Sequence, residues 1–185
     1  GGALIIDSPA IDARVVGWAA FKHGIDGYFY WHANHWRHNS QKRVGDRNQD
    51  VWADPVTFDN RSEGKDDNGF INGDGVLVYP GEEKLHREQD RGIAGPISTI
   101  QMANLRRGLQ DHALLTMARR LGLEQEVSAE LNRLVPRLFS EAKPDALGFS
   151  EDGNEYEQAR QRLLRAIAQR EGRSSARAGA AGGAR

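Results

Sequence analysis

The chain has 185 residues, of which 25 are basic and 26 acidic, so its formal net charge is −1. A balance so close to zero gives no basis for bulk electrostatic attraction to nucleic acid, and no nucleic-acid partner is expected. The absence of cysteine excludes disulfides, cysteine-bound zinc and cysteine nucleophiles, but it leaves the cellular compartment open.

Apolar residues make up 38% of the chain, which together with the glycines is an ordinary proportion for a globular protein with a core. No apolar run approaches the roughly 18 residues that span a bilayer, so we expect a soluble chain without a membrane span. The sequence begins without methionine in the apolar run Ala3-Leu4-Ile5-Ile6, which indicates a fragment with further residues upstream.

A helix is predicted after Ser8-Pro9, because serine caps helices and proline is tolerated at the first helical position. Gly24 is expected to end this helix in the left-handed conformation. Residues at steps of three and four form one face: Ile11, Val15, Trp18 and Lys22.

Two short strands are predicted on either side of a long polar segment. Residues 28–32 are aromatic and follow a glycine, which favours a strand buried on both faces. Residues 33–75 show no sustained periodicity and are interpreted as a long loop, either functional or disordered. Residues 76–79 are the second strand, and residues 82–91 are a flexible stretch.

The second half of the chain has helical periodicity. Ser98 and Gln101 match a capping box, and the helix that follows is expected to stop at Gly122. Its predicted apolar face consists of Met102, Leu105, Leu109 and Ala113.

A further helix over residues 123–139 is expected to be kinked or shortened by Pro136. Tyr156, Leu163 and Ile167 indicate a last amphipathic helix. From residue 172 onward the chain is Gly, Ala, Ser and Arg, a composition that predicts a disordered tail.

Aromatic and amide side chains gather in the run Trp31-His32-Ala33-Asn34-His35-Trp36, where the first predicted strand meets the long loop. Flat aromatic faces can stack on sugar rings, and the Asn34 amide can donate to and accept from a hydroxyl or acetamido group. The alternative is structural: Trp31 fills a core and Trp36 packs the loop down.

Metal sites are weakly supported. His32, His35 and His38 have a spacing that would gather imidazoles on a helix, but it scatters them at the junction of a strand and a loop. An EF-hand register starting at Asp66 puts Phe70 where an oxygen ligand is needed. We therefore expect solvated or hydrogen-bonded histidines, with no metal and no cofactor.

Paired carboxylates are the usual catalytic groups of glycoside hydrolysis, and two adjacent pairs occur here, Asp66-Asp67 and Glu82-Glu83. Both pairs lie in polar loops, where nothing raises one pKa above the other. We interpret them as solvated loop charges and assign no catalytic residue.

An ordered series of motifs over roughly residues 7–115 resembles glycoside hydrolase family 123, in particular its C-terminal part, also known as domain of unknown function 4091. The motifs that carry the resemblance are Arg14 with Trp18, Gly24, Gly27, Trp31, Asn34, Trp36, Gly73-Asp74-Gly75, Tyr79-Pro80-Gly81, Gly95-Pro96, and Leu105-Arg106 with Gly108 and Asp111.

The resemblance implies an α/β fold, the C-terminal fragment of a (β/α)8 TIM barrel. Residues 28–32 and 76–79 would be its last strands, and residues 99–120 its closing helix. The barrel part would cover residues 1–121, a helical extension 122–171 and a disordered tail 172–185. A whole barrel needs typically about 250 residues, so the upstream barrel segment of the same protein is an expected partner.

The resemblance also implies an activity, since family members are similar to exo-acting β-N-acetylgalactosaminidases. In these enzymes the acetamido oxygen of the substrate attacks the anomeric carbon, and an adjacent Asp-Glu pair assists. That pair is expected upstream of Gly1, so whether this chain is an enzyme by itself stays open. The carbohydrate substrate would contact a wall made of Trp31, Asn34, Trp36, Asp74 and Tyr79.

Two alternatives remain. The chain is either part of an active hydrolase or a non-catalytic carbohydrate-binding or structural module derived from such a barrel. It departs from the family at three charged positions, where Gln101, Ala103 and Arg107 replace an arginine, a glutamate and an aspartate. We expect the helix to survive these changes and its ion pairs to differ.

Overall fold

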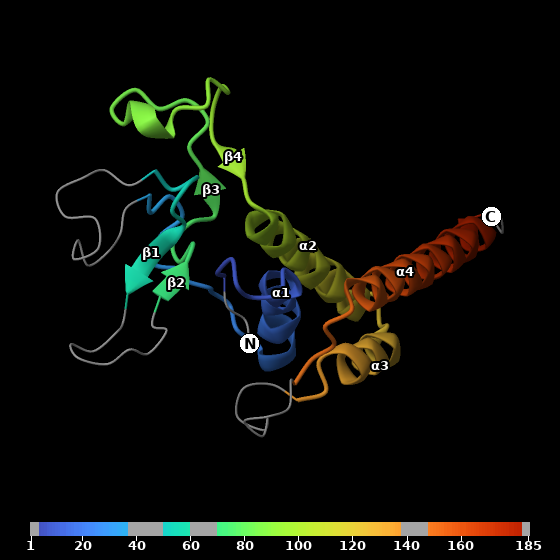
Figure 1. Ribbon diagram of the computed structural model, residues 1–185. Coiled ribbons are helices and arrows are strands. Elements are labelled where there is room, and N and C mark those ends of the chain that lie inside the picture. The colour runs from blue at the N-terminus through green and yellow to red at the C-terminus, as the bar shows by residue number, and fades with distance from the viewer. Residues whose placement is uncertain (1–3, 37–49, 60–69, 138–147, 183–185) are drawn as a thin grey trace. The chain divides into compact units, whose positions relative to one another are not determined.

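The computed structural model describes residues 4–36, 50–59, 70–137 and 148–182 (Figure 1). The chain divides into two compact units: unit 1 is Gly1–Arg14 with Tyr28–Arg106, and unit 2 is Val15–Gly27 with Arg107–Arg185. The elements in chain order are α1 (Ile11–His23), β1 (Val56–Asp59), β2 (Phe70–Asn72), β3 (Val78–Tyr79), η1 (Arg87–Gln89), β4 (Ile97–Ser98), α2 (Ile100–Arg120), α3 (Glu124–Leu134) and α4 (Gly153–Gly182).

Unit 1 contains two small antiparallel sheets. Strand β1 pairs with β2, with an irregularity between Val56 and Phe58, and β3 pairs with β4. An isolated antiparallel bridge joins Asn34 to Val76. The core of this unit contains Leu4 and Leu77, and the partly buried side chains of Tyr30, Met102 and Leu105 pack against it.

Unit 2 is helical, and its helices approach closely at a pair of glycines. A Cβ added to Gly17 would lie 2.0 Å from the carbonyl oxygen of Gly108, so a side chain there would force the backbones of α1 and α2 apart. Next to Gly17, the buried Trp18 indole N–H donates over 3.0 Å to the buried carboxylate of Asp111, which lies three residues after Gly108. Arg160 of α4 donates to the other oxygen of Asp111 over 2.8 Å. The polar contacts therefore satisfy a carboxylate that is 1% exposed.

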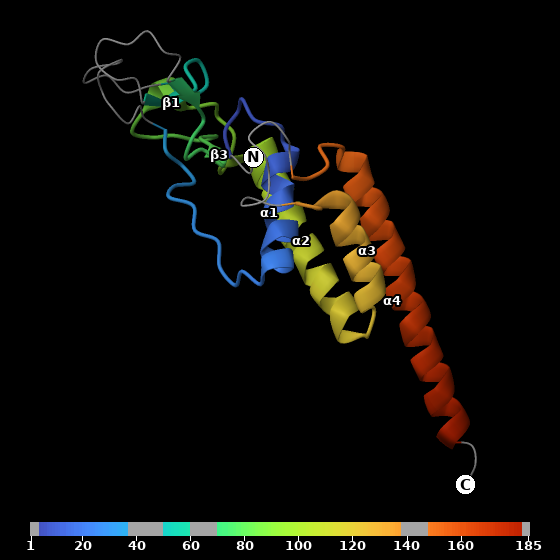
Figure 2. The same ribbon diagram turned by 90° about the horizontal axis from the view of Figure 1, so that it is seen from below.

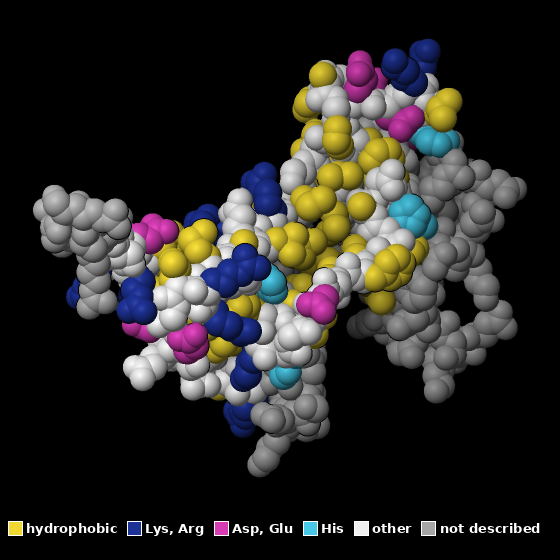
Figure 3. Space-filling model, turned by 180° about the vertical axis from the view of Figure 1, so that it is seen from behind, with side chains coloured by type: hydrophobic (Ala, Val, Ile, Leu, Met, Phe, Trp, Pro, Cys, Tyr) yellow, Lys and Arg dark blue, Asp and Glu magenta, His cyan; other side chains and the backbone are white. Residues whose placement is uncertain are grey.

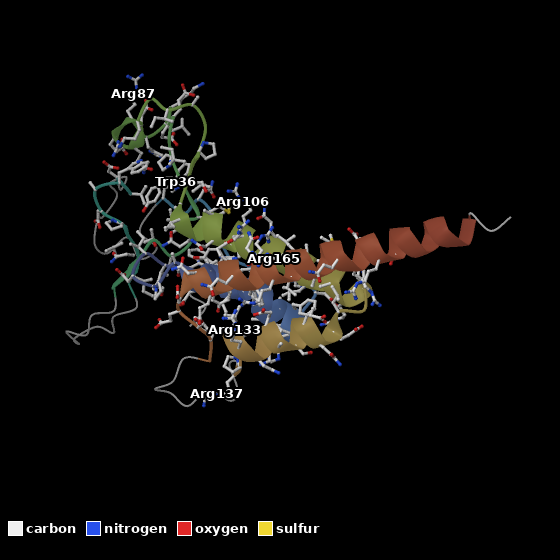
Figure 4. The ribbon with its side chains drawn as sticks, turned by 90° about the vertical axis from the view of Figure 1, so that its right-hand side faces the viewer. Trp36, Arg87, Arg106, Arg133, Arg137 and Arg165 are labelled. Atoms are coloured by element: carbon white, nitrogen blue, oxygen red, sulfur yellow. The ribbon has the colours of Figure 1, made fainter. Side chains whose placement is uncertain are left out.

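Helix α3 lies beside the first half of α4, and α4 continues past it toward the C-terminus (Figure 2). Glu130 of α3 accepts hydrogen bonds from Arg162 of α4 and from Arg133, which is labelled in Figure 4. Although burial alone would raise it, the pKa of Glu130 is lowered by these two guanidinium groups. Within the described parts of the chain, none of the helices combines the length and the apolar composition that crossing a bilayer requires.

The predicted helices are present, with corrections at their ends. Helix α1 ends at the predicted glycine, Gly24, whose φ is +63°. Helix α2 is capped by Thr99, not by Ser98, because the Thr99 hydroxyl accepts from the Met102 N–H over 3.1 Å and donates to the carbonyl of Leu77 over 2.8 Å. The cap thus joins the start of α2 to the chain just before β3.

The predicted apolar face of α2 is wrong in its second half. Leu109 is 56% exposed and Ala113 is also exposed, whereas Gly108, Asp111 and Leu115 are buried. The inward face of α2 carries Gly108, which contacts Gly17, and Asp111, which accepts from Trp18. Neither residue is apolar in the sense that the periodicity counts, so the apolar pattern does not identify this face.

The C-terminal predictions are confirmed in part. Helix α3 stops at Leu134, two residues before Pro136, as the proline predicted, and Leu138 lies outside the described residues. Tyr156 and Leu163 of α4 are buried as expected. The prediction of a disordered tail is wrong for the backbone of residues 172–182, which continues α4.

Of the two predicted strands, one is absent and the other is shorter than expected. Residues 28–32 form no strand, and Phe29 is 87% exposed where two-sided burial was expected. A strand needs partners, and the described residues supply none for this segment. Strand β3 confirms the second half of residues 76–79. Residues 33–75 are not structureless, because β1 and β2 lie within them, and residues 82–91 contain η1. The coarse class, a mixture of helices and small sheets, agrees with the sequence.

Candidate functional site

Three tryptophan indoles of unit 1 are anchored on one short segment, residues 74–80. The Trp31 N–H donates to Asp74 Oδ1 over 3.1 Å. Trp36, labelled in Figure 4, donates to the carbonyl of Val78 over 2.8 Å. Trp52 donates to the carbonyl of Pro80 over 3.1 Å. We call these three side chains the tryptophan row. Their N–H groups are satisfied, so their rings are held in place while part of each ring stays accessible.

Asp74 is fixed from two directions. The Tyr30 hydroxyl donates to Asp74 Oδ1 over 2.9 Å and accepts from the Gly75 N–H over 2.8 Å. The buried Thr57 hydroxyl donates to the main-chain carbonyl of Asp74 over 2.7 Å. Burial raises the pKa of Tyr30 well above its usual range, and the neighbouring Asp74 carboxylate raises this pKa further. The phenol therefore stays protonated and keeps its bond to Asp74.

Gly75 allows the Trp31 ring to sit against the backbone. Its φ of +78° lies in the region that favours glycine, and an added Cβ would lie 2.9 Å from both Trp31 Cζ2 and the Cβ of His35. The Trp31 ring is flanked by His32, with ring centroids 5.3 Å apart, and by His35, at 4.9 Å. These two imidazoles therefore pack around the indole; His38 lies outside the described residues.

A second aromatic contact lies at the other end of the segment. The rings of Trp52 and Tyr79 stack with centroids 4.5 Å apart and planes inclined by 28°. The guanidinium carbon of Arg91 lies 5.3 Å from the centre of the Trp52 ring, and its Nη2 donates to both oxygens of Asp50, each over 3.0 Å. Burial raises the pKa of Tyr79. Sequence reasoning missed Trp52, although a tryptophan in an otherwise polar loop was a usable signal.

The five side chains that the sequence singled out for the substrate wall lie on or beside residues 74–80. Trp31 bonds to Asp74, Asn34 forms a bridge with Val76, and the Trp36 indole reaches the strand that contains Tyr79. Trp31 is 40% exposed and Asn34 is exposed, while Trp36, Asp74 and Tyr79 are half-buried. Contacts with residues 74–80 therefore join Trp31, Asn34 and Trp36 to the segment of unit 1 that contains Asp74 and Tyr79.

The loop carboxylate Glu83 accepts from the N–H groups of Leu85 and His86. The Leu85 N–H, followed by that of His86, holds the pKa of Glu83 below its usual range. A carboxylate kept ionised in this way organises its loop and is poorly suited to protonate a leaving group. The pair Asp66-Asp67 lies outside the described residues.

The site therefore offers flat aromatic surfaces, an exposed amide and a fixed carboxylate, which together suit recognition of a polar ring with apolar faces. The sequence profile of the family described as glycoside hydrolase 123, catalytic domain, matches residues 4–118, a range that contains the tryptophan row and most of α2. No curated protein matches the chain. The matched range covers more than half of the 185 residues and includes all five residues of the predicted wall. The chain therefore belongs to glycoside hydrolase family 123.

Proposed function

We propose that this chain supplies the sugar-binding wall of a hydrolase that acts on glycans with a terminal β-linked N-acetylhexosamine, of the N-acetylgalactosamine type. The observation that supports the proposal is that Trp31, Asn34 and Trp36 all contact residues 74–80, the segment that contains Asp74 and Tyr79. Anchored indoles provide stacking surfaces, and the exposed Asn34 amide is able to pair with both the N–H and the carbonyl of an acetamido group.

The proposed reaction is substrate-assisted. The acetamido carbonyl oxygen attacks the anomeric carbon, the glycosidic bond breaks, and the leaving oxygen takes a proton from a carboxylic acid. Water then opens the cyclic intermediate and restores the acetamido group. The wall contributes by holding the ring so that the acetamido oxygen lies behind the anomeric carbon, which is a gain from orientation.

We propose that the acidic pair for this reaction comes from residues upstream of Gly1. Two observations support this. Asp74 already accepts bonds from Tyr30 and Trp31, and Glu83 is committed to its own loop. Both carboxylates are engaged by hydrogen bonds within unit 1, and the Leu85 N–H lowers the pKa of Glu83, which does not suit a general acid.

We further propose that residues 28–32 become a strand of a (β/α)8 barrel when the rest of the barrel is present. The supporting observation is exposure: Tyr28 is 48% exposed and Phe29 87% exposed, in a segment whose composition favours a buried strand. Exposed apolar side chains appear as yellow areas in Figure 3. Neighbouring strands and outer helices would cover both faces of such a segment.

A second candidate function is a carbohydrate-binding module without catalysis. It is favoured by the hydrogen bonds that already engage the carboxylates of Asp74 and Glu83. Binding of N-acetylgalactosamine without any turnover would support this candidate over the hydrolase.

The test uses protein expressed from its complete reading frame and three 4-nitrophenyl β-glycosides, those of N-acetylgalactosamine, N-acetylglucosamine and galactose. Release from the N-acetylgalactosaminide and none from the galactoside is expected, because the galactoside lacks the attacking acetamido oxygen. Equal hydrolysis of all three would refute the substrate-assisted proposal.

The wall itself is tested by Trp31→Ala. Loss of one ring stack costs about 1 to 3 kcal/mol elsewhere, so the Kd for N-acetylgalactosamine should rise by about 5- to 150-fold. The matched control is Leu85→Ala, an apolar side chain of unit 1 that is 87% exposed and lies outside the wall. Unchanged affinity of a folded Trp31→Ala protein would remove Trp31 from the binding site.

A further inference from the structure

Gln89 is a buried polar side chain in a loop of otherwise accessible residues. Only 1% of it is exposed, whereas the other residues of 82–92 are exposed or half-buried. Buried polar side chains are normally hydrogen-bonded, and the amide Nε2 of Gln89 donates to the main-chain carbonyl of Trp36 over 3.3 Å. The two residues are 53 positions apart in the sequence. Gln89 therefore joins the loop between β3 and β4 to the tryptophan row.

The loop holds Gln89 in place through its own contacts. The Arg91 and Ile93 N–H groups donate to the carbonyl of Gly81 over 2.8 and 3.3 Å, which closes the loop at its start. The closure is tight, because a Cβ on Gly81 would lie 2.4 Å from the carbonyl oxygen of Ile93. Within η1, the Gln89 N–H donates to the carbonyl of His86 over 2.9 Å. The side-chain amide is therefore presented from a backbone that is already ordered.

Trp36 is attached at two points, and Gln89 supplies one of them. The indole N–H donates to the carbonyl of Val78 over 2.8 Å, which fixes the edge of the ring. The main-chain carbonyl of Trp36 accepts from Gln89, which fixes the backbone that carries the ring. Two attachment points restrict the ring more than one does. An aromatic side chain ordered in advance loses little conformational entropy when a ligand stacks on it.

We infer that Gln89 is a positioning residue of the sugar-binding wall, which acts on the ligand through Trp36 by keeping that indole in the orientation that stacks on the sugar. The inference rests on the proposed function and adds to it a residue from the loop between β3 and β4, outside the five residues of the wall. Removing the Gln89 donor should therefore weaken sugar binding only while the Trp36 ring is present.

Gln89→Met tests the inference, because methionine is similarly long and unbranched but has no N–H donor. The matched control is Gln101→Met: Gln101 is also buried in unit 1, and its amide donates over 3.2 Å to the main-chain carbonyl of Ile5. Calorimetric titration with N-acetylgalactosamine should give a Kd about 3- to 10-fold higher for Gln89→Met, the effect of about one neutral hydrogen bond, and a change of less than about twofold for Gln101→Met. In the Trp36→Ala background, Gln89→Met should leave the Kd unchanged.

A second measurement follows Trp36 without any sugar. Fluorinated tryptophan gives one fluorine NMR resonance for each of the four tryptophans, and Trp36→Phe identifies the resonance of Trp36. Gln89→Met should shift this resonance, and Gln101→Met should leave it in place. If Gln89→Met fails to fold, Gln89→Asn replaces it, because asparagine keeps the amide but withdraws it by one methylene; the Kd and the resonance should change in the same way.

The outcomes separate the two proposals. An unchanged Kd for folded Gln89→Met overturns the positioning role alone, and so does an equal rise in Kd in the wild-type and Trp36→Ala backgrounds. An unshifted Trp36 resonance also overturns the positioning role, whether or not the sugar binds. If the wild-type protein does not bind N-acetylgalactosamine, the proposed function is overturned and this inference with it.

Discussion

The substitution Gly75→Ala tests whether the Trp31 position depends on close contact with the backbone. Two costs are expected. A residue with a Cβ at φ +78° costs about 1 to 2 kcal/mol relative to glycine. The new Cβ would also lie 2.9 Å from Trp31 Cζ2, 2.9 Å from the Cβ of His35 and 3.1 Å from the Cβ of His32. Relieving these contacts should add about 1 to 3 kcal/mol, the usual range for overpacking.

Gly95→Ala is the matched control, because Gly95 has almost the same φ, +77°, and nothing within 4 Å of an added Cβ. Urea denaturation followed by tryptophan fluorescence gives the free energy of unfolding of each variant. Gly75→Ala should lose about 1 to 3 kcal/mol more than Gly95→Ala, and its Trp31 should be displaced, with weaker binding of N-acetylgalactosamine. Equal losses for the two variants would refute the reasoning, since only the backbone cost would then be present.

Two further predictions concern unit 2. Gly17→Ala should lower the free energy of unfolding by more than about 3 kcal/mol, because its Cβ would meet the Gly108 carbonyl at 2.0 Å. The control Gly172→Ala has open space around the added Cβ and should be neutral or stabilising by up to about 1 kcal/mol. Thermal unfolding of both variants checks this prediction, and similar Tm values would contradict it. Glu130→Gln should cost about 2 kcal/mol at pH 7 through weakened bonds to Arg162. Because the folded-state pKa of Glu130 is lowered, its contribution is complete above the unfolded pKa of about 4.3 and is lost as pH falls through the folded pKa, so the difference between the urea midpoints of wild type and variant should shrink as pH falls below about 4.3. A difference that stays constant from pH 7 to pH 3 would contradict this assignment.

The helices were predictable because their signals are local. Gly24 ends α1, Pro136 follows the end of α3, and the spacing of Tyr156 and Leu163 identifies the buried face of α4. The cap of α2 was misplaced by one residue, since Ser98 and Thr99 are both good caps. The choice between them depends on the carbonyl of Leu77, which is distant in sequence and accepts from the Thr99 hydroxyl.

The strands were less predictable because pairing is not local. Residues 28–32 have the composition of a strand but have no strand partner among the described residues, whereas β1 and β2 pair within a stretch that shows no periodicity. The same distinction applies to the site. Trp31 and Trp36 were recognisable from their neighbours, but Trp52 joins them only through the carbonyl of Pro80. Nothing near Trp52 in the sequence indicates that contact.

The charged departure at Arg107 shows how a changed family position is accommodated. Arg107 bonds to both oxygens of Glu157 in α4, over 3.0 and 2.8 Å, and this carboxylate raises the pKa of Arg107. Both partners belong to unit 2, whereas the tryptophan row belongs to unit 1. The pair is partly exposed, so its contribution to stability is at most about 1 kcal/mol. The arginine at this position therefore joins α2 to α4 through Glu157, and the hydrogen bonds that anchor the tryptophan row are made by other residues.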